Sequence, residues 1–105
     1  MPTRSKRPPK HPDPLEEARR RSNAGKLRIS VHGNGRMDER RVDRMDVLHA
    51  LSEFLRNPSR DEFKPEHNSW SYRIDGTWPD GHKGYLSFAL PDPFVLVVTV
   101  VRKGR

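Results

Sequence analysis

Residues 94–101 read FVLVVTVV, and this stretch decides the fold. Seven of its eight side chains are apolar, and Thr99 is the single polar one. The run is far shorter than the roughly 18 residues of a membrane span, and β-branched side chains dominate it. Strands that are buried on both faces have this composition. We therefore expect residues 94–101 to form the central strand of a β-sheet.

Two further strands are predicted upstream of this one. WSYRID (70–75) alternates apolar and polar side chains, which is typical of a half-buried strand. YLSFAL (85–90) is the next strand. WPDGHKG (78–84) and PDP (91–93) have the composition of turns. Strands that short loops connect pair antiparallel, so the sequence predicts a small antiparallel sheet.

Helices are expected before the strands. Asp43 has the character of an N-cap, and Asp46 places a carboxylate near the positive end of the same helix. The apolar stripe of this helix is expected to contain Met45, Leu48, Leu51 and Leu55, widened by Val47 and Phe54. Pro58 should end it, and an earlier helix should begin just after a cap at Ser30. The predicted fold is α+β, with two N-terminal helices packed on a small curved antiparallel sheet.

The basic charge is concentrated in the first quarter of the chain. Residues 1–26 hold eight Lys/Arg and three Asp/Glu, a net charge of +5, whereas residues 27–105 hold thirteen and eleven, a net charge of +2. Five of the first fourteen residues are proline, and apolar side chains are too few to offset the entropy of ordering. PLEEARRR (14–21) has the pattern of a helical turn or two, with proline at its start and Glu16 and Glu17 placed against the arginines. We nevertheless expect 1–26 to be a disordered basic tail and 27–105 to be a single domain. The tail is either a solvated extension or an arm that adds affinity for nucleic acid.

The composition excludes several classes of function. The chain has no cysteine, so it has neither disulfides nor thiolate metal sites, and this slightly favours a reducing compartment. No apolar run has the length of a membrane span or the pattern of a signal peptide, so a cytoplasmic location without membrane contact is expected. The five histidines have no metal-ligand spacing, and neither a P-loop nor a nucleophile elbow is present. We expect no metal and no cofactor.

A stripe of cations lies near the start of the expected domain. His32, Arg36 and Arg40 are four residues apart, and a step of four turns a helix by about 400°, so the three would share one face. Arginine binds phosphate in a bidentate way, and histidine exchanges a proton near neutral pH. Arg41 and Arg44 add charge beside the stripe. Alternatively, the stripe is a solvated face paired with Asp38, Glu39 and Asp43.

The strands and their loops carry four more candidates. Arg73 lies on the polar side of its strand, where it would meet a ligand or form a cross-strand ion pair. Thr99 would either present its hydroxyl to a site on the sheet or satisfy a structural hydrogen bond. His82 and Lys83 would either contact nucleic acid or simply close a hairpin.

The segment SVHGNGRMDERRVDRMDVLHAL (30–51) resembles the pattern Ser-x-His-Ala-x-x-Arg-Met-x-x-Arg-x-Ile/Val-x-x-x-Asp-Val-x-x-x-Leu of a large family of small bacterial domains. The matching residues are Ser30, His32, Arg36, Met37, Arg40, Val42, Asp46, Val47 and Leu51. NPSRD, YRIDG and VVTVVRKG also fit, so the resemblance covers about residues 28–103. The chain departs from the pattern at Gly33, where alanine is usual, and Gly35 adds a second glycine to the helix start.

This family is similar to the barnase–EndoU–colicin–RelE type of fold, whose members are mostly metal-independent ribonucleases or toxins paired with antitoxins. The resemblance implies a RelE-like (BECR-like) domain with RNA as the substrate. The catalytic residues that it implies are His32, Arg36, Arg40, Arg73 and Thr99. The further RNA contacts are expected at Arg41, Arg44, His82 and Lys83. An acidic antitoxin or immunity protein is a second expected partner.

Two functions follow from these expectations. The first is a metal-independent endoribonuclease, in which His32 moves a proton and arginines hold the phosphate. The second is a non-catalytic module of the same fold that binds RNA or a partner protein. The sequence offers no second proton carrier in the domain other than His82 or Lys83, so the catalytic hypothesis is incomplete.

Overall fold

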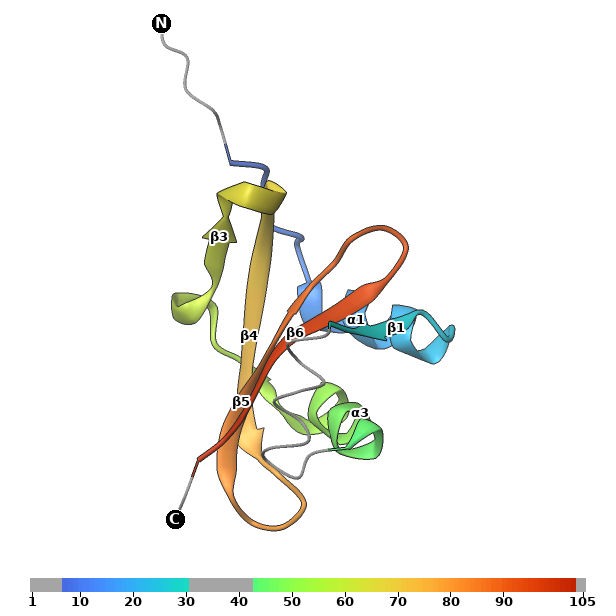
Figure 1. Ribbon diagram of the computed structural model, residues 1–105, viewed down its shortest axis with the longest axis vertical. Helices are drawn as coiled ribbons and strands as arrows, with labels where there is room; N and C mark the ends of the chain where they lie inside the picture. Colours follow the sequence, from blue (N-terminus) through green and yellow to red (C-terminus); the bar gives the residue numbers. More distant parts are fainter. Residues whose placement is uncertain (1–6, 31–42, 104–105) are drawn as a thin grey trace, which may run out of the picture.

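A computed structural model describes residues 7–30 and 43–103 of the chain (Figure 1). In this part, two α-helices and six β-strands form one α+β fold, with short 3-10 turns between strands. In chain order the elements are α1 (Pro14–Asn23), β1 (Leu27–Ile29), α3 (Arg44–Glu53), β2 (Leu55–Arg56), η1 (Pro58–Arg60), β3 (Glu62–Lys64), η2 (Pro65–His67), β4 (Ser69–Thr77), β5 (Lys83–Ala89) and β6 (Val95–Arg102). Neither described helix has the length and apolarity needed to cross a bilayer.

The sheet is mixed, in the order β1-β6-β5-β4-β2. β4, β5 and β6 form the antiparallel hairpins that the short loops predicted. β3 pairs with the start of β4, and β2 pairs with the same edge of β4 further along. β1 was not predicted, and it runs parallel to β6 with Leu27 beside Val95. The α+β prediction is therefore confirmed, but the purely antiparallel sheet is wrong at this one edge.

The central position predicted for residues 94–101 is confirmed. β6 lies between β1 and β5. Val95, Val97 and Val100 are fully buried, and a register irregularity opposite Ser87 and Phe88 explains why the spacing of these valines changes from two to three. The remaining side chains of the strand, up to residue 101, are half-buried. Helices thus cover only one face of β6, so the central position is confirmed but the expected burial on both faces is wrong.

Both helices lie on the same side of the sheet and contact each other (Figure 1). The helix residues in the hydrophobic core are Leu15 and Ala18 of α1 and Val47, Ala50 and Leu51 of α3. They pack on the sheet residues Tyr72, Ile74, Leu86, Phe88, Val97 and Val100. Side chains that alternate with these point to the other side. We call that side the outer face, and its residues are Arg73, Asp75, Thr77, Lys83, Tyr85, Ser87, Thr99 and Val101.

The N-terminal segment belongs to the fold, so the predicted disordered tail is wrong for residues 7–26. Asp13 caps α1 by accepting a hydrogen bond from the amide of Glu16, and two residues of the helix enter the core. The arginines that suggested a solvated tail bind backbone carbonyls instead. Arg19 donates to the carbonyls of Leu51 and Ser52, and Arg21 donates to those of Leu90 and Phe94. Residues 1–6 of the predicted tail lie outside the described part.

The segment before α1 lies against β4. The indole N–H of Trp70 donates to the carbonyl of Pro8 over 2.8 Å, and the amide of His11 donates to the hydroxyl of Tyr72 over 2.9 Å. The ammonium group of Lys10 lies 3.0 Å from a carboxylate oxygen of Asp61. These contacts tie the first described residues to the middle of the chain.

α3 confirms the predicted cap but corrects the predicted stripe. Asp43 and Asp46 form a reciprocal capping box. The stripe is wrong at both ends, because Met45 is 70% exposed in the first turn and Leu55 is 74% exposed in β2. The helix ends at Glu53, since the next residue is already extended. The predicted helix after Ser30 falls on residues 31–42, outside the described part.

Two glycines make room for the aromatic pair at one end of the core. Gly76 of β4 pairs with Gly84 of β5. A Cβ atom at Gly76 would lie 2.5 Å from the ring of Phe54, and one at Gly84 would overlap Nε1 of Trp78 and the carbonyl of Val101. The rings of Phe54 and Trp78 meet edge to face with centroids 4.8 Å apart. The backbone of this strand pair therefore lies directly between the aromatic rings and the outer face.

Candidate functional site

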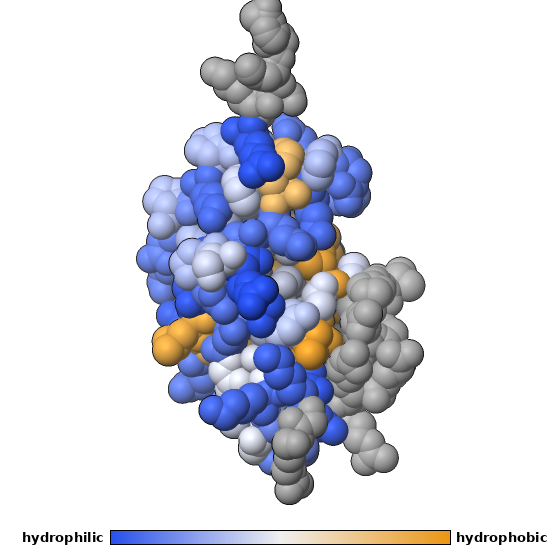
Figure 2. Space-filling model, turned by 90° about the vertical axis from the view of Figure 1, so that its left-hand side faces the viewer, coloured by the Kyte–Doolittle hydropathy of each residue, from blue (hydrophilic) through white to orange (hydrophobic). Residues whose placement is uncertain are grey.

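The sheet brings two of the predicted site residues into one row. Arg73 pairs with Ser87 across β4 and β5, and Ser87 pairs with Thr99 across β5 and β6. All three side chains therefore point to the outer face, with the serine between the other two. Neither α1 nor α3 covers this face. Figure 2 views the molecule from the side away from these helices and shows a mostly hydrophilic surface with isolated hydrophobic groups.

Arg73 is held flat on the sheet. Its guanidinium carbon lies 3.4 Å from the ring centroid of Tyr85, and its Nε donates to Asp75 over 2.8 Å. The side chain is only 16% exposed. An ion pair was one of the two roles predicted for Arg73, although the partner lies on the same strand rather than on its neighbour. The result is a fixed guanidinium plane stacked on an aromatic ring.

The carboxylate of Asp75 accepts hydrogen bonds from two neighbouring side chains. Besides Arg73, it accepts a hydrogen bond of 2.9 Å from the side-chain amide of Asn57. Burial acts to raise its pKa, but the hydrogen bonds from Arg73 and Asn57 outweigh burial and hold the pKa below its ordinary value. The carboxylate therefore stays ionised at neutral pH, and Arg73 offsets its charge.

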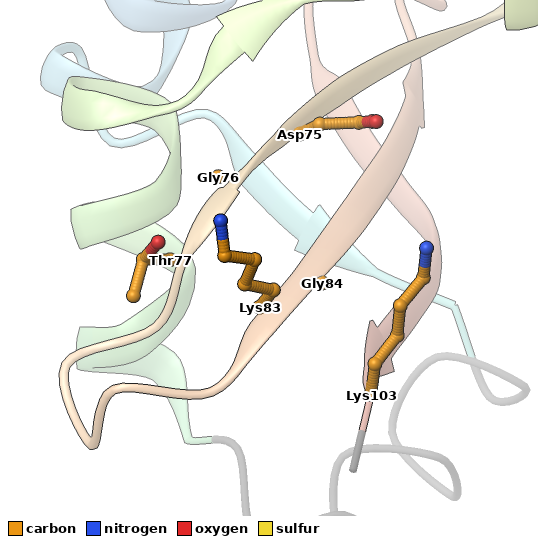
Figure 3. Close-up of a pocket in the computed structure, with 6 residues that line it drawn as sticks. All are labelled: Asp75, Gly76, Thr77, Lys83, Gly84 and Lys103. Atoms are coloured by element: carbon orange, nitrogen blue, oxygen red, sulfur yellow. The ribbon is translucent and has the colours of Figure 1, made fainter. Parts of the chain in front are cut away.

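A shallow pocket of about 250 Å³ lies next to this pair on the outer face (Figure 3). Its lining residues are Asp75, Gly76, Thr77, Lys83, Gly84 and Lys103. Lys83 begins β5 and Lys103 follows β6, and the amide of Lys103 donates to the carbonyl of Lys83 over 2.7 Å. Figure 3 shows the two lysine side chains on either side of Gly84, with Asp75 beyond them.

The two lysines give the pocket a positive charge. Among the described residues, neither ammonium group forms an ion pair or a hydrogen bond with a carboxylate. Lys103 acts on Asp75 only through longer-range attraction. Three cations, Arg73, Lys83 and Lys103, thus face one carboxylate, Asp75, which leaves a net charge of +2 on this part of the outer face. Such a surface attracts anions.

The structure separates His82 from Lys83, although the sequence suggested both as RNA contacts. Nδ1 of His82 lies 3.1 Å from a carboxylate oxygen of Asp80, and the same carboxylate binds Arg102 over 2.5 Å. His82 therefore pairs with Asp80 within the turn between β4 and β5, and it does not line the pocket. Arg44 is exposed at the first position of α3.

The predicted cationic stripe cannot be placed against this site. His32, Arg36, Arg40 and Arg41 lie outside the described residues. The predicted cleft in which the stripe faces Arg73 stays a prediction. Arg73 itself faces away from both described helices.

Histidine, the usual proton carrier near neutral pH, is missing from the outer face within the described ranges. The histidines in the described ranges are His11, His49, His67 and His82, and none lines the pocket or belongs to the row of Arg73 and Thr99. Residues 7–30 and 43–103 also contain no group of three side chains that could hold a metal ion. This face can bind and orient an anion, and the ionisable side chains that it offers are Asp75, Lys83, Tyr85 and Lys103 rather than a histidine.

The side chains of the site that the sequence did not single out are Asp75, Thr77, Tyr85, Ser87 and Lys103. Tyr85 and Asp75 are cross-strand partners, and only the strand register shows this. Lys103 had a readable signal, because strand alternation from Val101 places position 103 on the same face.

The chain matches no protein-family model and no curated protein. The resemblance to the RelE type of domain therefore stays a prediction.

Proposed function

We propose that the protein binds single-stranded RNA on the outer face of its sheet. The observation that carries this proposal is the pair of lysines, Lys83 and Lys103, which converge on a sheet face without a carboxylate partner among the described residues. Ammonium groups that neutralise backbone phosphates supply most of the affinity for RNA. A cytoplasmic location follows from such a ligand, and it is part of the proposal.

The stack of Arg73 on Tyr85 supports a single strand as the ligand. Proteins bind unpaired bases by stacking them on aromatic rings or on guanidinium planes. Here the ring and the guanidinium form one platform, which Asp75 holds in place. Ser87 and Thr99 lie beside it in the next two strands and offer hydroxyl groups to sugar or phosphate.

The proposal concerns binding, because His32, the proton carrier that the resemblance implies, lies outside the described residues. Cleavage without a metal needs a base for the 2′-hydroxyl and an acid for the leaving oxygen. No described histidine lies on the outer face. Ribonuclease activity, with His32 as the proton carrier and Arg36 and Arg40 at the phosphate, is the extension of the proposal that the resemblance implies.

Fluorescence anisotropy with a labelled single-stranded RNA tests the binding proposal. Replacing both site lysines, Lys83→Ala with Lys103→Ala, should weaken binding about tenfold near 0.1 M salt and flatten the log–log salt dependence by about 1.4, since each phosphate contact contributes about 0.7. The matched control is Lys26→Ala with Lys64→Ala, which removes the same charge elsewhere. Equal losses in the two double variants would mean that binding follows net charge rather than this site.

The extension to cleavage is tested on the same RNA in EDTA. The active hypothesis expects products with the wild-type protein and none with His32→Ala. If the RNA is bound but stays intact with both the wild-type protein and His32→Ala, the protein is a non-catalytic RNA-binding module. Absence of any RNA binding by the wild-type protein would contradict the proposal and direct attention to an acidic protein partner, such as an antitoxin.

A further inference from the structure

The pocket lies where two strand ends meet. β5 and β6 are antiparallel, so the start of one lies beside the end of the other. This places Lys83 and Lys103 at the same end of the sheet, joined by a backbone hydrogen bond of 2.7 Å. Two positive charges from distant parts of the sequence are thereby fixed at one point.

The nearby carboxylate does not neutralise them. Asp75 already binds Arg73 and Asn57 through short hydrogen bonds of 2.8 and 2.9 Å. Its charge is offset by the guanidinium of Arg73. The two ammonium groups therefore present a nearly uncompensated double charge to solvent.

The floor of the pocket is backbone. Gly76 and Gly84 carry no side chains, because the rings of Phe54 and Trp78 occupy the space behind them. The exposed hydroxyl of Thr77 lies at the rim and can donate a hydrogen bond. A volume of about 250 Å³ admits a phosphate together with part of its sugar.

We propose that this pocket binds the terminal phosphate of an RNA strand that lies along the outer face. An internal phosphodiester carries one negative charge, whereas a terminal phosphate carries close to two at pH 7, since its second pKa is about 6. Two ammonium groups match the terminal group in charge. The inference rests on the proposed function and adds to it a preference for one chemical end.

Three labelled RNAs of one sequence test the inference: one with a 5′-phosphate, one with a 3′-phosphate and one with hydroxyls at both ends. The wild-type protein should bind one of the phosphorylated strands about five- to tenfold more tightly than the hydroxyl strand at pH 7.5. At pH 5.5 this preference should shrink, because the terminal phosphate then carries close to one charge.

Variants assign the preference to the pocket. Lys83→Ala and Lys103→Ala should each remove most of it, whereas the control Lys26→Ala should retain it. Lys83→Arg keeps the charge and should keep the preference, which separates loss of the charge from loss of the fold. Equal binding of all three strands by the wild-type protein would overturn the inference and leave the proposed function standing. A preference that survives both alanine substitutions would overturn it as well, and failure of all three strands to bind would contradict the proposed function itself.

Discussion

Within the described part of the chain, Asp61 connects three separate segments. Its carboxylate is fully buried and binds the guanidinium of Arg56 at 2.6 Å, the ammonium of Lys10 at 3.0 Å and the backbone amide of Arg73 at 2.9 Å. These partners come from β2, from the segment before α1 and from β4. One side chain therefore holds the N-terminal segment and the edge of the sheet together.

Asp61→Ala should lower the free energy of unfolding by about 3 kcal/mol, because it leaves Arg56 and Lys10 without their shared partner in a partly buried place. Urea denaturation followed by circular dichroism measures the loss. Glu62→Gln is the control, since Glu62 is exposed and its pair with Lys64 should contribute less than about 1 kcal/mol. Equal effects of the two substitutions would contradict the role given to Asp61.

The stability of the protein should fall in acid, and Asp61 should account for part of the fall. Burial acts to raise its pKa, but the hydrogen bonds from Arg56, the Arg73 amide and Lys10 outweigh burial and hold the pKa below its ordinary value of 3.8. The lowered pKa means that ionised Asp61 stabilises the fold above about pH 4, and this contribution is lost as the pH falls through 3.8 towards the folded value. Urea midpoints measured from about pH 6 to about pH 3 should fall less steeply for Asp61→Ala than for the wild type. Parallel curves would show that other carboxylates cause the acid sensitivity.

Among the secondary-structure elements, α3 depends on its first turn. Asp43 accepts a hydrogen bond of 3.0 Å from the amide of Asp46, and the carboxylate of Asp46 accepts one of 3.2 Å from the amide of Asp43. Asp43→Ala should cost about 1 kcal/mol, as the loss of an N-cap usually does. Thermal denaturation measures it, and Asp43→Ser, which can still cap, should recover most of the loss. No recovery would indicate that the charge of Asp43 matters more than its hydrogen bond.

The pairing of β4 with β5 depends on two glycines. Gly84→Ala would push a methyl group into the carbonyl of Val101 and the indole of Trp78, so we expect a loss of about 3 kcal/mol and a shift in tryptophan fluorescence. Ser87→Ala changes the same strand on its outer face and should cost less than about 1 kcal/mol. A stable Gly84→Ala variant with unchanged fluorescence would show that Trp78 can move aside.

The elements that the sequence predicted correctly are those with a strong local signal. The alternation of residues 70–75 and the apolar run of residues 94–101 are visible without knowledge of the partners. α1 was predicted only as a helical turn or two within a disordered tail. Only Leu15 and Ala18 of that helix enter the core, and its arginines gain their role from carbonyls in distant segments. β1 has three residues, and its pairing with β6 leaves no local trace.

The sequence predicted individual residues of the candidate site but not how they group together. Arg73 was identified because its strand places it on a polar face, Thr99 because it is the single polar side chain of an apolar strand, and Lys83 because it lies in a predicted hairpin loop. Their grouping depends on register across three strands, which a single strand does not encode. The same limit explains why Tyr85 was not recognised as the partner of Arg73.

At the level of the whole molecule, the first quarter of the chain is a structural part. Deleting residues 1–25 should abolish the cooperative fold, because it removes the buried residues of α1 and the hydrogen bonds from Arg19 and Arg21. A variant that begins at residue 7 retains all the described contacts and should fold. Dispersion of amide resonances in NMR spectra separates the two outcomes. If the protein still folds after removal of residues 1–25, this segment is a tail that the fold does not need.

The parallel pairing of β1 with β6 also bears on how the protein is made. Leu27 leaves the ribosome well before its partner Val95, because most of the domain is translated between them. The sheet cannot close until that late strand emerges, and until then the apolar sides of the helices and hairpins have no complete core to enter. Contacts between such distant positions slow folding. The sheet is therefore expected to form only after β6 has left the ribosome, so a nascent chain that stops before Val95 should not give the native fold.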